Sequence, residues 1–142
     1  MLIEVKKREK EIVKALYLDF KKSEYESVMT ETSIVISELK KTIKNIHHWA
    51  KPQLVMPALL NFPSSSKIYK ESYGTVLIIS PWNYPYQLAF APLIGAIAAG
   101  NTVVLKPSEL TPNTSNITKE IIEAVFDKNL VAVVEGGVDV SS

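Results

Sequence analysis

A run of 34 consecutive residues, from Ser72 to Leu105, contains no charged side chain and no histidine. Pro81, Pro85 and Pro92 interrupt the run, so it lacks the ~18 unbroken apolar residues that a membrane-spanning helix requires. A globular chain can accommodate such a segment only at the centre of its hydrophobic core. The remaining residues must therefore be arranged to cover this segment.

Three continuous apolar segments in the second half of the chain have the length and composition of strands. They are residues 75–79, 102–105 and 130–134, and the segments between them, 88–99 and 111–126, have helical spacing. The order strand, helix, strand, helix, strand predicts an α/β fold with a parallel sheet and right-handed crossovers. Because the first of these strands is apolar throughout, we expect it to be buried on both faces.

The first half of the chain predicts helices followed by a short hairpin. Apolar residues recur at helical spacing over residues 2–20, and again from a capping box at residues 23–26 as far as residue 49. Pro52 ends the second helix, and residues 53–62 and 66–71 are expected to form short strands. The chain then divides into a helical segment with a hairpin, residues 1–71, and an α/β unit, residues 72–142.

Composition and charge exclude several classes of function. The 142 residues include no cysteine, so they hold no disulfide, no cysteine-ligated metal and no catalytic thiol. Basic residues near the start alternate with Glu4, Glu9 and Glu11, which favours a solvated helix face over a nucleic-acid surface. His47 and His48 are adjacent on a helix and point about 100° apart, so we expect no metal site there. No secretory signal or membrane span is apparent, and a cytoplasmic location is expected.

Polar or glycine-bearing loops follow each predicted strand. They comprise residues 80–85, 106–109 and 135–137. Because ligands of open parallel sheets bind beyond the carboxyl ends of the strands, these loops are the candidate ligand site.

Four residues in these loops have side chains or backbones suited to ligand chemistry. Lys106 and Glu109 are spaced to hydrogen-bond the hydroxyls of a ribose, and a carboxylate there disfavours a 2′-phosphate. Asn83 is an uncharged donor suited to a developing oxyanion, and Gly136 would let the backbone approach a ligand closely. Structural alternatives stay open for each residue taken singly: a surface ion pair, a loop cap and a turn.

Three ordered motifs, at residues 73–85, 91–101 and 105–112, closely resemble the aldehyde dehydrogenase superfamily. Residues 22–26, together with the long helix as far as Trp49, are similar to its class-3 branch, whose members act on fatty, aromatic and medium-chain aldehydes. The resemblance implies that residues 72–142 are the first three strands of a Rossmann-like NAD(P)-binding domain. It also implies that Asn83 helps to form the oxyanion hole. The cofactor contacts that it implies are Ile79, Ser80, Pro81, Trp82, Lys106, Glu109 and Gly136.

The resemblance further implies an enzyme that oxidises aldehydes to carboxylates, with NAD as cofactor and NADP as an alternative, and that assembles as a homo-oligomer, typically a dimer. In that family a cysteine thiolate attacks the aldehyde, yet no cysteine is present here. We therefore expect an N-terminal fragment, inactive alone, whose catalytic domain lies outside the chain. The alternative is an autonomous non-catalytic module that binds nucleotide weakly or offers its helices to a partner.

Overall fold

A three-stranded parallel sheet organises the half of the chain that contains the uncharged run. The structure, a computed structural model, describes residues 1–137; residues 138–142, the end of the predicted 72–142 unit, lie outside the described residues. The strands are β3 (Thr75–Ile79), β4 (Thr102–Lys106) and β5 (Val131–Val133), in the spatial order β3-β4-β5. Both strand pairs are parallel, which confirms the predicted α/β class.

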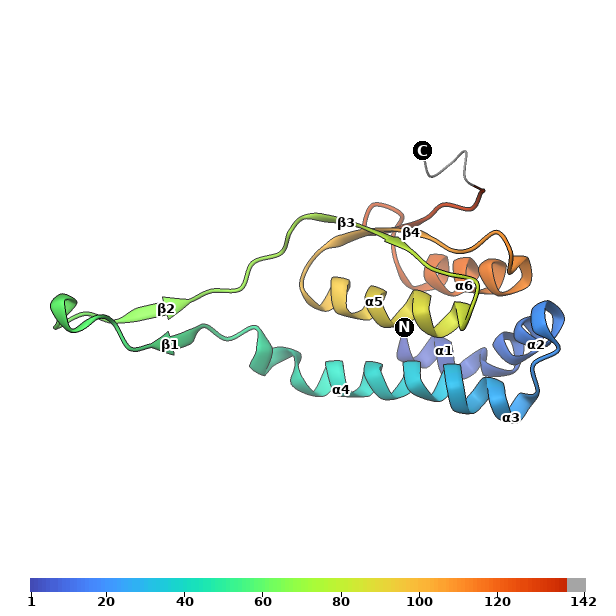
Figure 1. The fold of residues 1–142 in the computed structure, drawn as a ribbon, viewed down its shortest axis with the longest axis horizontal. Helices are drawn as coiled ribbons and strands as arrows, with labels where there is room; N and C mark the ends of the chain where they lie inside the picture. Colours follow the sequence, from blue (N-terminus) through green and yellow to red (C-terminus); the bar gives the residue numbers. More distant parts are fainter. Residues whose placement is uncertain (138–142) are drawn as a thin grey trace.

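Helices form two layers on one side of this sheet (Figure 1). The middle layer consists of α5 (Pro85–Ala98) and α6 (Pro112–Val125). The outer layer packs on it through contacts of α4 with α5 and of α2 with α6. The outer helical segments are α1 (Leu2–Lys7), α2 (Glu9–Phe20), α3 (Glu24–Ser27), the π-helical turn η1 (Val28–Thr32) and α4 (Ser33–Trp49).

The middle layer explains why the uncharged run contains a helix without a polar face. Helix α5 touches the sheet through β3 and β4 and touches α4 on its other side, so apolar residues are needed all round it. Tyr86 and Phe90 are fully buried, with ring centroids 4.4 Å apart. The helix begins three residues earlier than predicted because Pro85 occupies its first turn, where proline is well tolerated. No helix within residues 1–137 has both the length and the apolar character needed to cross a bilayer.

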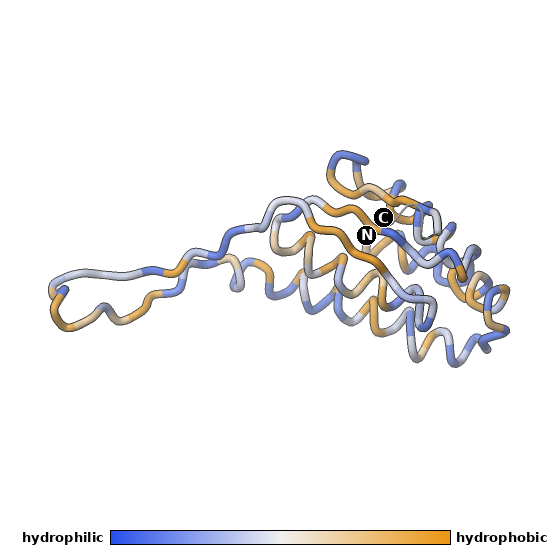
Figure 2. The backbone as a smooth tube through the Cα atoms, turned by 45° about the horizontal axis from the view of Figure 1, so that its top comes forward, coloured by the Kyte–Doolittle hydropathy of each residue, from blue (hydrophilic) through white to orange (hydrophobic). Residues whose placement is uncertain are grey.

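The register of the sheet places two rows of apolar side chains against the helices. Val76, Val103 and Val131 are paired across the three strands, and the next row consists of Ile78, Leu105 and Val133. In Figure 2 these strands are among the most hydrophobic parts of the backbone. The buried members of the two rows form one core with the inner faces of α5 and α6.

The expectation that strand 75–79 is buried on both faces is wrong. Leu77 and Ile79 are 62% and 58% exposed, whereas Ile78 between them is buried. Strand β3 is an edge strand, and the helices of residues 1–137 cover only one face of the sheet. The outer face is therefore apolar and open to solvent.

The helical prediction for the first half needs two corrections. The helix expected over residues 2–20 is interrupted at Arg8, whose φ of −100° ends α1 and whose guanidinium pairs with Glu11 and Glu120. The helical spacing up to residue 49 also predicts a buried apolar stripe that includes Ile43, whereas Ile43 is 57% exposed. The predicted cap is present, since Ser23 Oγ accepts a hydrogen bond from Glu26 N at 3.2 Å.

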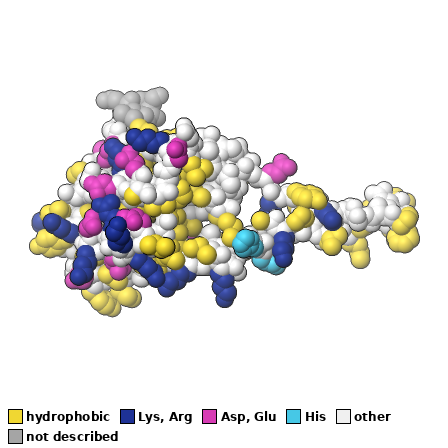
Figure 3. Space-filling view, turned by 180° about the vertical axis from the view of Figure 1, so that it is seen from behind, with side chains coloured by type: hydrophobic (Ala, Val, Ile, Leu, Met, Phe, Trp, Pro, Cys, Tyr) yellow, Lys and Arg dark blue, Asp and Glu magenta, His cyan; other side chains and the backbone are white. Residues whose placement is uncertain are grey.

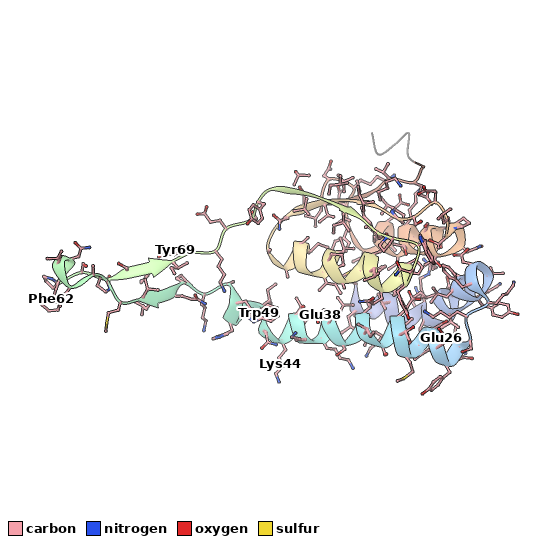
Figure 4. All side chains as sticks on the ribbon, viewed as in Figure 1. Glu26, Glu38, Lys44, Trp49, Phe62 and Tyr69 are labelled. Atoms are coloured by element: carbon pink, nitrogen blue, oxygen red, sulfur yellow. The ribbon has the colours of Figure 1, made fainter. Side chains whose placement is uncertain are left out.

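Residues 53–69 form an arm that extends away from the layered body (Figure 1). Its strands, β1 (Gln53–Val55) and β2 (Ser66–Ile68), pair antiparallel and are shorter than predicted, because the 3₁₀ turn η2 (Leu59–Asn61) and Pro63 occupy the tip. Figure 4 shows Phe62 at the tip and Tyr69 directly after β2, both outside the layered body. Figure 3 shows hydrophobic side chains gathered on the arm. Its exposed apolar residues are Leu54, Val55, Met56, Leu59, Leu60, Phe62, Ile68 and Tyr69.

Exposed apolar surface on this scale predicts self-association of the 142-residue chain at micromolar concentration. The double substitution Leu59→Lys/Leu60→Lys, which places charge on almost fully exposed apolar positions of the arm, should shift the chain toward monomer. Analytical ultracentrifugation over a concentration series measures this shift.

The matched control is Ser64→Lys/Ser65→Lys, which adds the same charge to the same tip without removing apolar surface. A wild-type chain that sediments as a clean monomer throughout the series would contradict the prediction.

Candidate functional site

The three predicted loops lie at one edge of the sheet, called here the carboxyl edge, where β3, β4 and β5 all end. Ile79 is the register partner of Lys106, and the ladder continues because Ser80 N donates to Lys106 O at 3.0 Å. On the other side of β4, Val134 N donates to Leu105 O at 2.9 Å. Parallel pairing thus brings together loops that are separated by more than 20 residues in the sequence.

Lys106 and Glu109 form an ion pair at the carboxyl edge. Lys106 Nζ lies 3.2 Å from Glu109 Oε2; the lysine side chain is buried and the glutamate side chain is partly exposed. Helix α6 fixes the turn between them, because Ser115 Oγ donates to Ser108 O at 2.8 Å and Thr111 N donates to the same oxygen at 3.3 Å. The pair therefore holds a buried amine against a carboxylate that is partly open to solvent beyond β4.

The pKa of the Glu109 carboxyl lies below its ordinary value. The main cause is a hydrogen bond from its own backbone N–H, and the hydrogen bond from Lys106 is the second cause. Both favour the ionised form, so Glu109 is a carboxylate at neutral pH and can accept hydrogen bonds from a ligand hydroxyl.

Ser80, whose backbone N–H bonds to Lys106 O, has a buried hydroxyl at the same carboxyl edge. Its residue is 5% exposed, and within residues 1–137 the Oγ atom has no hydrogen-bond partner. A buried polar atom without a partner is uncommon, and at a sheet edge it indicates a place where a ligand or water completes the bonding. Ile79 and Pro81 flank it and are exposed.

The third loop is held against α6. Lys119 Nζ lies 2.7 Å from Glu135 Oε2, which ties the start of the loop to the helix. Gly136 follows with φ +150°, a backbone conformation that residues with a side chain rarely adopt. The structure thus places Gly136 next to the end of β4, on the side away from β3.

Asn83 lies in a separate groove of about 260 Å³ between the loop after β3 and the outer helices. Asn83 and Trp82 are exposed, and within the described chain the Asn83 side chain makes no hydrogen bond. Tyr84 next to it has φ +47° and ψ +51°, which is the left-handed region and unusual for a bulky residue. The other residues lining the groove are Phe20, Lys21, Lys22, Glu26, Glu31 and Pro85.

Glu31 and Lys22 are at this groove, and sequence reasoning missed both. Glu31 is fully buried, and its Oε1 accepts from Lys22 Nζ at 2.7 Å. One signal could have found it: Glu31, Val35 and Leu39 are spaced four residues apart, which puts a carboxylate on an otherwise apolar helix stripe. A charged residue on such a stripe requires a partner.

Within residues 1–137 no group of three or more His, Cys, Asp or Glu side chains is arranged to hold a metal ion. His47 and His48 are exposed near the end of α4. In Figure 3 the histidines lie where the arm leaves the body, well away from the carboxyl edge.

Comparison with known proteins decides the family. The sequence model of the aldehyde dehydrogenase family matches residues 2–142, nearly the whole chain. The chain belongs to the aldehyde dehydrogenase family. It is 49% identical over 135 residues to 4,4'-diaponeurosporen-aldehyde dehydrogenase of Staphylococcus aureus and 44% identical over 123 residues to aldehyde dehydrogenase family 3 member B1 of Bos taurus. Similarity to several family 3 members confirms the class-3 branch inferred from the motifs.

A solved aldehyde dehydrogenase has nearly the same fold over these residues. The substrate-bound AldH of Staphylococcus aureus matches with a TM-score of 0.96 and 47% identity, covering 99% of this chain and 31% of that one. Succinic semialdehyde dehydrogenase of Streptococcus pyogenes, solved with NADP⁺, shares the fold at a TM-score of 0.84 but is only 16% identical.

The chain spans less than a third of the length of these aldehyde dehydrogenases. The alignment covers 95% of this chain but 29% of the staphylococcal relative, and 87% of this chain but 26% of the bovine one.

The Lys106–Glu109 contact predicts a specific pH dependence. Because the pKa of Glu109 in the folded chain lies below its unfolded value, the contact is present above the unfolded pKa and is lost as the pH falls through the folded pKa. Lys106→Met should raise the pKa of Glu109 only part of the way to normal, since the larger cause, the backbone N–H, remains. Carboxyl chemical shifts followed by NMR titration measure both values.

Glu120 serves as the internal reference in the same spectra. Its pKa is lowered by hydrogen bonds from Arg8 and Asn116, so Lys106→Met should leave its titration unchanged. An unaltered Glu109 titration in the variant would show that the two side chains are not in contact in solution.

Proposed function

We propose that this chain forms the part of an NAD(P)-dependent aldehyde dehydrogenase that holds the adenosine side of the cofactor. The observation that carries the proposal is the Lys106–Glu109 pair at the carboxyl edge of a parallel sheet, the same edge that holds the unpartnered Ser80 hydroxyl. Open α/β sheets bind nucleotides at this kind of edge. Membership of the aldehyde dehydrogenase family supports the same assignment.

The residues present fit a ribose better than a phosphate. Lys106 would donate to one ribose hydroxyl and Glu109 would accept from the other, while Ser80 and the backbone at Gly136 supply further polar contacts. Ile79, Pro81 and Trp82 would provide exposed apolar contacts along the same loop. The negative charge of Glu109 disfavours a 2′-phosphate, so NAD is proposed as the cofactor and NADP as the poorer alternative. When bound, the nicotinamide of the cofactor accepts a hydride from the substrate.

Asn83 is proposed as the residue through which this chain touches the aldehyde. Its amide is free of other partners in the described chain and faces a groove, so it can donate to the substrate oxygen as negative charge develops there.

The 142 residues contain no cysteine, so the thiol nucleophile that the family uses is not among them. We therefore propose that this chain alone does not turn over aldehydes, and that the fatty or aromatic aldehydes of the class-3 branch are the substrates of the complete enzyme.

The same proposal assigns roles to the two units. Residues 72–142 supply the Rossmann-like cofactor surface, and residues 1–71 brace its helices and present the arm. The exposed apolar residues of the arm support a homo-oligomer, with a dimer as the expected form. A cytoplasmic location is proposed with it.

A non-catalytic nucleotide-binding or interaction module is the alternative. In that case this chain alone must contain every residue that is needed to bind the nucleotide. The affinity of the 142-residue chain for NAD distinguishes the module from the aldehyde dehydrogenase segment. The segment supplies only the adenosine contacts and should bind NAD weakly, whereas tight binding would favour the module.

Lys106→Ala and Glu109→Ala should each weaken binding of NAD to the chain by about tenfold, because each removes a charge-assisted hydrogen bond to the ribose. Lys128→Ala is the matched control, since Lys128 is exposed and pairs only loosely with Glu123 at 3.7 Å. Isothermal titration calorimetry with NAD, and with NADP to test the cofactor preference, measures the effect. Tight NAD binding that persists in both variants would contradict the assignment of Lys106 and Glu109 to the ribose site.

In a complete aldehyde dehydrogenase that carries this segment, Asn83→Ala should lower kcat by about 10²- to 10³-fold, the usual effect of removing one oxyanion donor. Binding of NAD should change little, because Asn83 lies in a groove separate from the Lys106–Glu109 pair. Steady-state kinetics with an aromatic aldehyde checks both. An unchanged kcat would exclude Asn83 from the reaction.

A further inference from the structure

Helix α5 begins without a cap of its own. Its N-cap residue, Tyr84, offers no side-chain hydrogen bond, and Pro85 in the first position has no N–H. The N–H groups of Tyr86 and Gln87 therefore have no partner within the helix, whereas Leu88 N donates to Tyr84 O at 2.9 Å. Uncapped donors at a buried helix end are costly, so another element must satisfy them.

Glu31 supplies the missing cap from the outer helical layer. Its Oε2 accepts from Tyr86 N at 2.9 Å and from Gln87 N at 3.2 Å, across 55 and 56 residues of sequence. The carboxylate is fully buried and lies at the N-terminal end of α5, where the free N–H groups point. The start of α5 is thus fixed by a residue that belongs to neither the sheet nor the loop.

Lys22 connects the same carboxylate to the loop itself. Its Nζ lies 2.7 Å from Glu31 Oε1 and 4.5 Å from the centre of the Tyr84 ring. Because both charged side chains are at least nine-tenths buried, removing one leaves the other unpaired at considerable cost. The two residues therefore act as one unit that holds Tyr84 in its left-handed conformation.

The helix that contains Glu31 departs locally from α-helical geometry. Glu31 lies in the π-helical turn η1, which inserts an extra residue between α3 and α4. Such turns are rare and are found mostly at functional sites.

We propose that Glu31, paired with Lys22, is a positioning residue that holds the Asn83 amide in place by fixing the backbone of Tyr84 and the first turn of α5. Asn83 makes no side-chain hydrogen bond in the described chain, so its position depends on the backbone that follows it. The inference rests on the proposed function, in which Asn83 donates to the aldehyde oxygen. A preorganised donor of this kind requires a rigid support.

The chain contains a second remote carboxylate cap that serves as a control. Asp19 accepts from Asn113 N at 3.2 Å and from Thr114 N at 2.8 Å at the start of α6. Asp19→Ala removes the same kind of cap, as Glu31→Ala does for α5, at a residue that does not line the Asn83 groove. Glu26→Gln is the second control, because Glu26, labelled on α3 in Figure 4, lines the same groove but forms no side-chain hydrogen bond in the described chain.

The test uses the ¹⁵N-labelled 142-residue chain with Leu59→Lys/Leu60→Lys as the background, because these arm substitutions favour the monomer and lie far from the Asn83 groove. Glu31→Ala should increase amide exchange at Tyr86 and Gln87 at least tenfold and lower the heteronuclear NOE of the Asn83 side-chain amide. Asp19→Ala and Glu26→Gln should do neither, even where Asp19→Ala lowers Tm as much. Glu31→Met combined with Lys22→Met provides a variant that should fold, because it leaves no unpaired buried charge, and it should still loosen Asn83, because methionine cannot accept the Tyr86 and Gln87 hydrogen bonds.

An Asn83 side chain that stays rigid when Tyr86 and Gln87 exchange faster would overturn the proposal, since Glu31 would then be only a structural cap. Asn83 mobility that rises equally in the Asp19→Ala variant would overturn it too. Failure of the proposed function gives a different result: Asn83 loosens as expected, but Asn83→Ala leaves kcat unchanged in the complete enzyme.

Discussion

Burial of α5 between the sheet and the N-terminal helices is the constraint on which the remaining structure depends. The helix has no charged residue, so both of its sides have to be covered by apolar surface. The sheet can cover only one side, which makes the first half of the chain a structural requirement for the second. This dependence also explains why α4 and α2 pack on α5 and α6 without a separate core of their own.

In the layered arrangement, the N-termini of α5 and α6 lie at the carboxyl edge close to buried surface. The backbone N–H groups of their first turns therefore need hydrogen-bond partners from outside the helix. Neither Tyr84 nor Thr111, the N-cap residues of α5 and α6, provides a side-chain cap. Carboxylates from the outer layer satisfy both helices, Glu31 for α5 and Asp19 for α6. Packing of the layers and positioning of the loops are thus parts of the same set of contacts.

Sequence reasoning predicted the elements that depend on local pattern. Apolar runs and helical spacing were sufficient for β3, β4, β5 and both crossover helices, and parallel topology was sufficient to bring Lys106 and Glu109 to one edge. Contacts made across long stretches of sequence were missed, above all those of Glu31 with Tyr86 and Gln87, because spacing along a helix does not reveal the partner. The exposed outer face of β3 was mispredicted for a related reason, since an apolar strand does not show what covers each of its faces.

The two remote carboxylates have one more consequence. The N-terminus of a helix at the carboxyl edge of a parallel sheet is ordinarily a good anion site, because its free N–H groups and dipole attract phosphate. Here both such termini are already occupied by negative side chains, so an incoming phosphate would meet repulsion at α5 and at α6 alike. A dinucleotide that rests its ribose on Lys106 and Glu109 must therefore direct its pyrophosphate away from both helices.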